Sequence, residues 1–92
     1  MLLKKGWKIK GIVQGVGFRF FALKKAKELS LKGYVKNLYD GSVEVCAYGE
    51  KSAIEKLEQD LYIGPPAAAV YAVESFEPSQ KLEEMDGFEI QY

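Results

Sequence analysis

The chain has 92 residues with a formal net charge of zero, and 48% of its residues are hydrophobic and 28% charged. This length is enough for one compact domain and not for two, so we expect residues 1–92 to form a single domain. The neutral charge argues against a strong nucleic-acid binder, while one cysteine and no histidine exclude a disulfide framework and leave almost no ligands for structural zinc.

The first predicted elements are a strand and a helix joined by a glycine-rich turn. Residues 7–13 alternate between polar and apolar side chains, which predicts a strand. The turn occupies residues 14–19, and a helical pattern follows over residues 20–31. The apolar face of this helix consists of Ala22, Ala26 and Leu29. Gly33 is placed to end the helix, since glycine readily adopts the left-handed conformation that terminates helices.

A β-hairpin is predicted next. Residues 34–37 and 42–48 are two short strand candidates, and Asp40 with Gly41 between them is a strong hairpin-turn signal. One side of the second strand carries Val43, Val45 and Ala47. Cys46 lies in the middle of that strand, where a small buried side chain is a better interpretation than a nucleophile.

The last part of the chain predicts a helix and two more strands. Ser52 and Glu55 have the spacing of a capping box at the start of the helix, and a Gly-Pro-Pro run at residues 64–66 breaks it. The buried stripe of this helix consists of Ile54, Leu57 and Leu61. Strands follow over residues 68–76 and 88–92, separated by a polar loop.

The predicted order is βαββαβ with a short extra strand at the C-terminus. Two helices in such an order pack most naturally on one face of an antiparallel sheet, so we predict an α+β fold of the ferredoxin-like sandwich type. Because this fold hosts many functions, the function has to be argued from the residues of a site.

The turn into the first helix has the features of an anion site. Gly15 and Gly17 allow the backbone to approach a ligand closely, and the helix N-terminus adds the positive end of its dipole. Arg19, the only arginine of the chain, lies where the turn becomes helix and can donate two parallel hydrogen bonds to a phosphate. The alternative is an ordinary tight turn with a surface cation, and a short glycine motif alone does not decide between the two.

Asn37 is the only asparagine of the chain and ends the strand candidate at residues 34–37. Beside a phosphate site, its side-chain amide, with two donors and an acceptor, can hold a water molecule in line for attack. The alternative is that Asn37 only starts the turn through Asp40 and Gly41, as asparagine often does.

Two long segments of the sequence together resemble the acylphosphatase family. Residues 11–19, GIVQGVGFR, are similar to its first signature, and residues 33–37, GYVKN, are similar to its second. The later matches are Gly41, Val43, Gly49, the run Gly64-Pro65-Pro66-Ala67 and the closing Phe88-Glu89-Ile90. The resemblance covers nearly the whole chain, and two long signatures at the right separation are too specific for a chance match.

The resemblance implies a metal-independent, cofactor-free hydrolase that converts an acyl phosphate to a carboxylate and inorganic phosphate. It implies that Arg19 binds the substrate phosphate and that Asn37 orients the attacking water. The backbone amides that would complete the anion cradle are those of Gly15, Val16, Gly17, Phe18 and Arg19. We also expect a cytoplasmic protein without a membrane partner, since the chain has neither a membrane-spanning apolar stretch nor a signal peptide. We expect it to be a monomer.

Two other interpretations stay open. One is an accessory acylphosphatase-like domain, such as the one at the N-terminus of hydrogenase-maturation carbamoyltransferases, although a chain that ends soon after the fold is complete favours a free-standing enzyme. The other is RNA binding, because RNA-recognition motifs share the βαββαβ order and residues 32–34 begin like their sheet motif. Residues 35–37 then lack the aromatic side chains that stack on bases.

Overall fold

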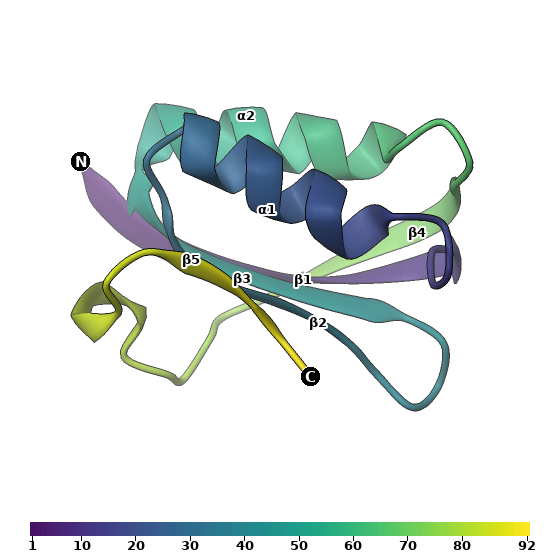
Figure 1. Cartoon of the computed structure of the whole chain (residues 1–92). Helices are drawn as coiled ribbons and strands as arrows, with labels where there is room; N and C mark the ends of the chain where they lie inside the picture. The colour runs from purple at the N-terminus through teal and green to yellow at the C-terminus, as the bar shows by residue number, and fades with distance from the viewer.

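The computed structural model describes all 92 residues of the chain. Its elements are β1 (Leu2–Ile12), α1 (Phe18–Glu28), β2 (Lys32–Asn37), β3 (Val43–Glu50), α2 (Lys51–Ile63), β4 (Ala69–Phe76), the 3-10 turn η1 (Leu82–Glu84) and β5 (Phe88–Gln91). Figure 1 shows the strands in one layer and both helices packed on one side of it. The predicted βαββαβ order with an extra strand, and the α+β ferredoxin-like class, are confirmed. None of the helices has the length and apolar composition needed to cross a membrane.

The sheet is mixed rather than purely antiparallel. Its strand order is β4-β1-β3-β2-β5, and all the pairs among β1, β2, β3 and β4 are antiparallel. The last strand, β5, runs parallel to β2, with Gly33 opposite Phe88 and Lys36 opposite Gln91. The expectation of an antiparallel sheet is therefore wrong for this edge strand. β4 lies at one edge of the sheet and β5 at the other. Residues 77–87, which include η1, form the connection between these two strands.

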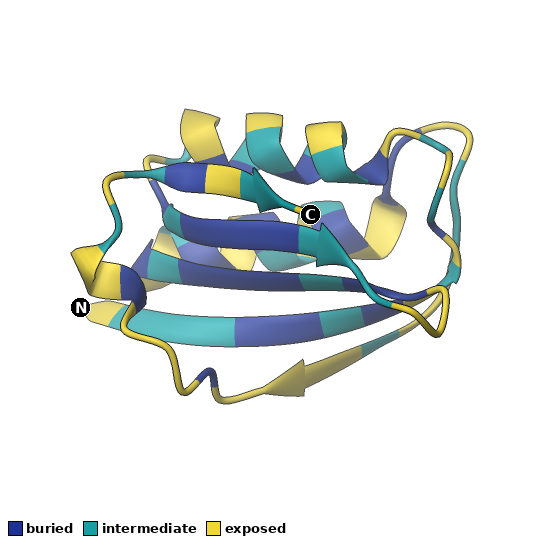
Figure 2. Ribbon diagram, turned by 60° about the horizontal axis from the view of Figure 1, so that its bottom comes forward, coloured by how far each residue is buried: buried dark blue, intermediate teal, exposed yellow.

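The core lies between the sheet and the two helices. The buried residues that the strands contribute are Trp7, Ile9, Val35, Val43, Val45 and Ala47, and those from the helices include Ala22, Ala26, Ile54, Leu57 and Leu61. The predicted apolar faces are confirmed for Ala22 and Ala26 on α1 and for Ile54, Leu57 and Leu61 on α2. Leu29 lies just after α1, as its C-cap, and is partly buried against the same core. Figure 2 shows the buried residues concentrated on the central strands, whereas most of β4 is exposed.

The first helix begins two residues earlier and ends three residues earlier than predicted, because α1 spans Phe18–Glu28. It ends in a Schellman motif, in which Ser30, at φ 58°, and Leu31 donate backbone hydrogen bonds back into the last turn. The expectation that Gly33 ends the helix is wrong. Gly33 lies in β2 at φ 143°, where a side chain would collide with the carbonyl group of Cys46 on β3.

No capping box forms at the start of α2. The N-cap is Glu50, its side chain makes no capping hydrogen bond, and Ser52 lies inside the helix. Met1 provides the contacts at the start of this helix instead. The Lys51 N–H donates to the Met1 carbonyl at 2.9 Å, and the Met1 ammonium pairs with Glu50 Oε2 at 3.0 Å. Sequence spacing around Ser52 could not reveal a partner that comes from the far end of the chain.

A second, smaller cluster is buried on the other face of the sheet. Tyr34, Cys46 and Leu82 pack there, with Leu82 supplied by the connection between β4 and β5. The Tyr34 hydroxyl donates to Glu44 Oε2 at 2.7 Å and accepts from Gln80 Nε2 at 3.0 Å and from Cys46 Sγ at 3.3 Å. The buried position predicted for Cys46 is confirmed.

Candidate active site

The loop between β1 and α1, residues 13–17, is called the glycine loop below. Gly15 and Gly17 both adopt left-handed conformations, at φ 75° and φ 82°, and a Cβ added at either would meet no atom within 4 Å. The need for glycine is therefore conformational, and the space beside the loop is open. Gly17 is the N-cap of α1 and provides no side-chain cap, so no capping side chain accepts from the N–H groups of the first helical turn.

The glycine loop, the first turn of α1 and the end of β2 line one small pocket. Its volume is about 150 Å³, and it is lined by Val13, Gly15, Gly17, Phe18, Arg19, Phe20 and Asn37. The fold thus brings Arg19 and Asn37, which were predicted from two separate segments, to the same pocket. Of the predicted cradle residues, only Val16 is absent from the lining, because its side chain packs against the core.

Arg19 lies in the first turn of α1, where it is half-buried and forms no ion pair with any carboxylate of the chain. Its guanidinium carbon lies 5.1 Å from the centroid of the Tyr92 ring, which is within the range of a cation–π contact. Tyr92 reaches this place because it follows β5, the strand that runs parallel to β2. Tyr92 could not be predicted as a site residue, since nothing in the local sequence pattern reveals the parallel pairing of β5 with β2.

Asn37 is the last residue of β2 and lies opposite Val43, on the side of the sheet that faces the helices. Its Oδ1 atom is buried and has no hydrogen-bond partner, and it is the only buried side-chain nitrogen or oxygen of the chain in that state. Leaving a buried polar atom unpaired costs about 1–3 kcal/mol, and nearly all such atoms in proteins are paired. An unpaired acceptor in the wall of a pocket with an unneutralised arginine indicates a place for a bound water or ligand.

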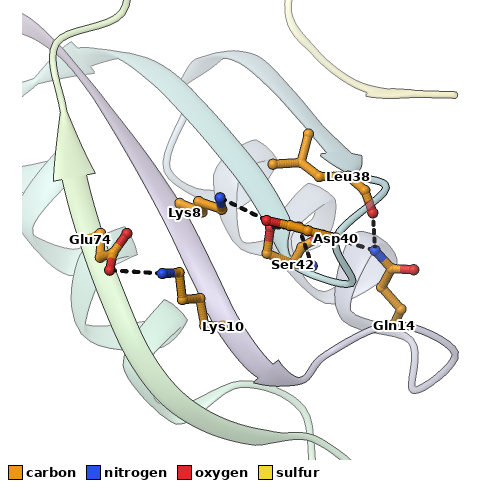
Figure 3. Close-up of polar contacts among 7 residues, drawn as sticks. All are labelled: Lys8, Lys10, Gln14, Leu38, Asp40, Ser42 and Glu74. Carbon is orange, nitrogen blue, oxygen red and sulfur yellow. Dashed lines mark hydrogen bonds and ion pairs between the residues drawn. The ribbon is translucent and has the colours of Figure 1, made fainter.

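The turn that follows Asn37 is tied to β1 on the open face of the sheet (Figure 3). Asp40 accepts hydrogen bonds from the backbone N–H and the hydroxyl of Ser42, and it pairs with Lys8 Nζ at 2.7 Å. The hydrogen bond from Lys8 and those from Ser42 hold the pKa of Asp40 well below its usual range. Gly41 adopts φ 93°, so the predicted turn at Asp40 and Gly41 is confirmed.

The same turn is also held by Gln14, a residue whose role the sequence analysis missed. Gln14 Nε2 donates to the carbonyl of Leu38 at 2.8 Å and to that of Ser42 at 2.9 Å. Its place in the first signature segment was visible in the sequence. The two carbonyls that it contacts lie more than twenty residues away along the chain, and no local pattern points to them.

A larger hollow adjoins the small pocket and shares Asn37 with it. Its volume is about 530 Å³, and it is lined by Gln14, Lys36, Asn37, Leu38, Tyr39 and Tyr92. The rings of Tyr39 and Tyr92 are exposed at its rim. A ligand whose anionic group lies beside Arg19 therefore has room for a second, less polar part on the other side of Asn37.

The structure buries the aromatic residue of the RNA-like segment and gathers no cluster of metal-ligand side chains. Tyr34, the aromatic residue of the RNA-like segment, is only 2% exposed and is hydrogen-bonded beneath the connection to β5, so it cannot stack on a base. No three His, Cys, Asp or Glu side chains gather in a group that could hold a metal ion.

Comparison with known proteins agrees with the resemblance seen in the sequence. The acylphosphatase family model matches residues 5–90. An acylphosphatase of Archaeoglobus fulgidus is 44% identical over 84 residues, which cover 91% of this chain and 92% of the relative. The crystal structure of an acylphosphatase from Bacillus subtilis matches the full length of both chains with a TM-score of 0.90 and 36% identity. A structure of full-length HypF also matches, with a TM-score of 0.85 and 28% identity, over only 12% of that chain. The chain belongs to the acylphosphatase family.

Proposed function

We propose that this protein hydrolyses the carboxyl-phosphate bond of acyl phosphates and releases a carboxylate and inorganic phosphate. The observation that carries the proposal is that Arg19 and the unpaired Oδ1 atom of Asn37 line the same pocket at the N-terminus of α1. One group is an unneutralised cation suited to phosphate, and the other is an unsatisfied acceptor suited to water. The activity is that of the family to which the chain belongs.

The substrate phosphate binds to the glycine loop and the first turn of α1. The backbone N–H groups of Gly15, Val16, Gly17, Phe18 and Arg19 form the cradle, and the helix dipole adds to the attraction. The guanidinium of Arg19 donates two parallel hydrogen bonds to phosphate oxygens. Because these donors are fixed before the substrate arrives, they stabilise the charge that develops in the transition state without rearranging.

Asn37 orients the attacking water. Its Oδ1 atom accepts a hydrogen bond from the water, which directs an oxygen lone pair toward the phosphorus. In phosphoryl transfer, much of the barrier lies in bringing the nucleophile in line with the leaving group, so one well-placed acceptor has a large effect on the rate.

The leaving group needs little assistance. A carboxylate departs readily with the electron pair of the broken P–O bond, and the hollow beside Tyr39 and Tyr92 has room for the acyl group. A covalent intermediate is not required. Cys46, the only thiol, is buried on the opposite face of the sheet, and this burial raises the pKa of the thiol to about 11.

The proposal includes a cytoplasmic monomer that acts on a small molecule, without a nucleic-acid or membrane partner. Both proposed catalytic side chains come from one chain, so the site needs no residue from a second copy. The zero net charge disfavours binding to nucleic acid, and a free thiol such as Cys46 is compatible with a reducing compartment. Light scattering during size-exclusion chromatography measures the oligomeric state.

Hydrolysis of benzoyl phosphate, compared with that of p-nitrophenyl phosphate, tests the activity. We expect the acyl phosphate to be hydrolysed without added metal and in the presence of EDTA, since the chain has no histidine and one buried cysteine. The monoester should react poorly, because its leaving group is worse and the site has no strong general acid. Inorganic phosphate should inhibit competitively. Complete loss of activity in EDTA, restored by magnesium or zinc, would refute the mechanism.

A further inference from the structure

Gln14 connects the two halves of the proposed site. It directly precedes Gly15 in the glycine loop, and its side chain crosses to the turn that follows Asn37. There its single amide nitrogen donates to two carbonyl oxygens, that of Leu38 at 2.8 Å and that of Ser42 at 2.9 Å (Figure 3). Both hydrogen bonds are partly buried, so water competes with them less than it does at the surface.

These two carbonyls belong to Leu38 and Ser42, the residues at the two ends of the turn. The Leu38 N–H donates to the Ser42 carbonyl at 2.9 Å, and the Gly41 N–H donates to the Leu38 carbonyl at 3.2 Å. Each carbonyl therefore has one backbone donor and receives its second from Gln14. Because carbonyl oxygens only accept, the NH₂ group of Gln14 has to face them, which settles the orientation of its amide. The side chain thus ties the residue next to Asn37 to the glycine loop.

The Lys8–Asp40 ion pair also holds this turn, but it is more exposed than the Gln14 hydrogen bonds. The Lys8–Asp40 ion pair holds the tip of the turn from the open face, and its side chains are 34% and 52% exposed. Exposed ion pairs of this kind contribute little to the stability of a fold. Gln14, in contrast, lines the same hollow as Asn37 and acts on the residue bonded directly to it. Of the two ties, only Gln14 joins Asn37 to the phosphate side of the site.

We propose that Gln14 is a positioning residue, which holds Asn37, and with it the attacking water, in line with the bound phosphate. The inference rests on the proposed function, in which Asn37 orients that water. Gln14 has no part of its own in binding phosphate or moving a proton. It acts through the Leu38 peptide, so its removal should lower the rate without weakening the anion site.

A double-mutant cycle between Gln14→Ala and Asn37→Ala tests this role, with benzoyl phosphate as substrate and inorganic phosphate as competitive inhibitor. Gln14→Ala alone should lower kcat roughly tenfold, while the inhibition constant of phosphate changes less than about threefold. In the Asn37→Ala background the same change should lower kcat less than about twofold, because nothing is left to position. Gln14→Met keeps the length, removes both donors without adding a charge and should behave like Gln14→Ala.

Gln80→Ala is the matched control, since it also loses a partly buried glutamine hydrogen bond, to the Tyr34 hydroxyl at 3.0 Å, on the face away from the pocket. It should leave kcat unchanged. Equal losses from Gln14→Ala in both backgrounds, a parallel loss of phosphate affinity, or wild-type kcat in Gln14→Met would overturn the positioning role and leave the proposed hydrolysis intact. An inactive wild-type protein would refute the proposed function itself, and the positioning role with it.

Discussion

Two polar side chains of β2, those of Tyr34 and Asn37, differ in whether their buried oxygen atoms have hydrogen-bond partners. The Tyr34 hydroxyl, on the open face, has three partners in Glu44, Gln80 and Cys46. The Oδ1 atom of Asn37, on the face toward the helices, has none. A satisfied network of this kind rigidifies the fold, whereas an unpaired buried atom lowers stability and needs another explanation. The comparison indicates that Tyr34 serves the structure and Asn37 serves the proposed chemistry.

Two cations near the same end of the sheet differ in a similar way. Lys8 pairs with Asp40, and the hydrogen bond to that carboxylate raises the pKa of the Lys8 ammonium. Arg19 has no carboxylate partner, and its guanidinium lies over the ring of Tyr92. An ion-paired lysine has its charge largely compensated within the protein, while the charge of Arg19 remains available to an incoming anion.

The largest effect is expected from Arg19→Lys. Lysine keeps the positive charge and loses the planar fork that binds two phosphate oxygens, so kcat/KM should fall roughly 10²–10³-fold and phosphate inhibition should weaken. Steady-state kinetics with benzoyl phosphate measure both. Lys24→Ala, on an exposed position of the same helix, is the control for a general change of potential. Near wild-type kinetics in Arg19→Lys would mean that the arginine supplies only positive charge.

Asn37→Ala should affect the reaction nearly as strongly but in a different parameter. Loss of one preorganised group that acts on the water lowers kcat at least about 10²-fold, while phosphate affinity stays within a few-fold of wild type. The melting temperature should not fall, because the removed acceptor has no partner in the fold. If the variant binds phosphate as poorly as Arg19→Ala, Asn37 belongs to the cradle, and a different group holds the water.

Tyr34→Phe should show the reverse behaviour. Removing the hydroxyl takes a partner from Glu44 and from Gln80, so stability should fall by about 1–3 kcal/mol while kcat and KM stay at the wild-type values. Urea denaturation and kinetics on the same preparation measure the two quantities. A drop in kcat without a loss of stability would contradict the purely structural role of Tyr34.

Asp40→Asn should have the smallest effect. The folded-state pKa of Asp40 lies below its ordinary value of 3.8, so the ionised carboxylate stabilises the fold above that pH, and the contribution is lost as the pH falls toward the folded-state pKa. The variant should melt slightly below wild type at pH 7, and the difference should shrink below about pH 4. A gap that persists at low pH would show that the carboxylate charge is not its cause.

The features of the fold that depend on local pattern could be predicted from the sequence. Alternation located the strands, and helical spacing identified the stripe of Ile54, Leu57 and Leu61. The features that depend on distant partners could not be predicted. The parallel pairing of β5 and the contact of Met1 with the start of α2 both lie outside what a local window shows.

The residues of the candidate site also fall into those that could be predicted from local segments and those that could not. Arg19 and Asn37 were predicted because each lies in a recognisable segment, and the structure brings both to one pocket. Gln14 and Tyr92 were not predicted as site residues. Their contacts depend on how the turn after β2 and the final strand pack against the glycine loop and α1. Side chains that act across the fold are visible only once the fold is known.

The strand order has a consequence for how fast the chain folds. β1 is an interior strand whose neighbours come much later in the sequence, so that Trp7 lies opposite Val45 on one side and Ser75 on the other. Neither pairing can form until a long stretch of chain has closed on itself, which costs entropy before any contact repays it. We expect refolding on a timescale of roughly milliseconds to seconds, as for other small domains with mostly distant strand pairings. During that interval the apolar strands lie open to other molecules, so protein concentration will govern the yield of refolding.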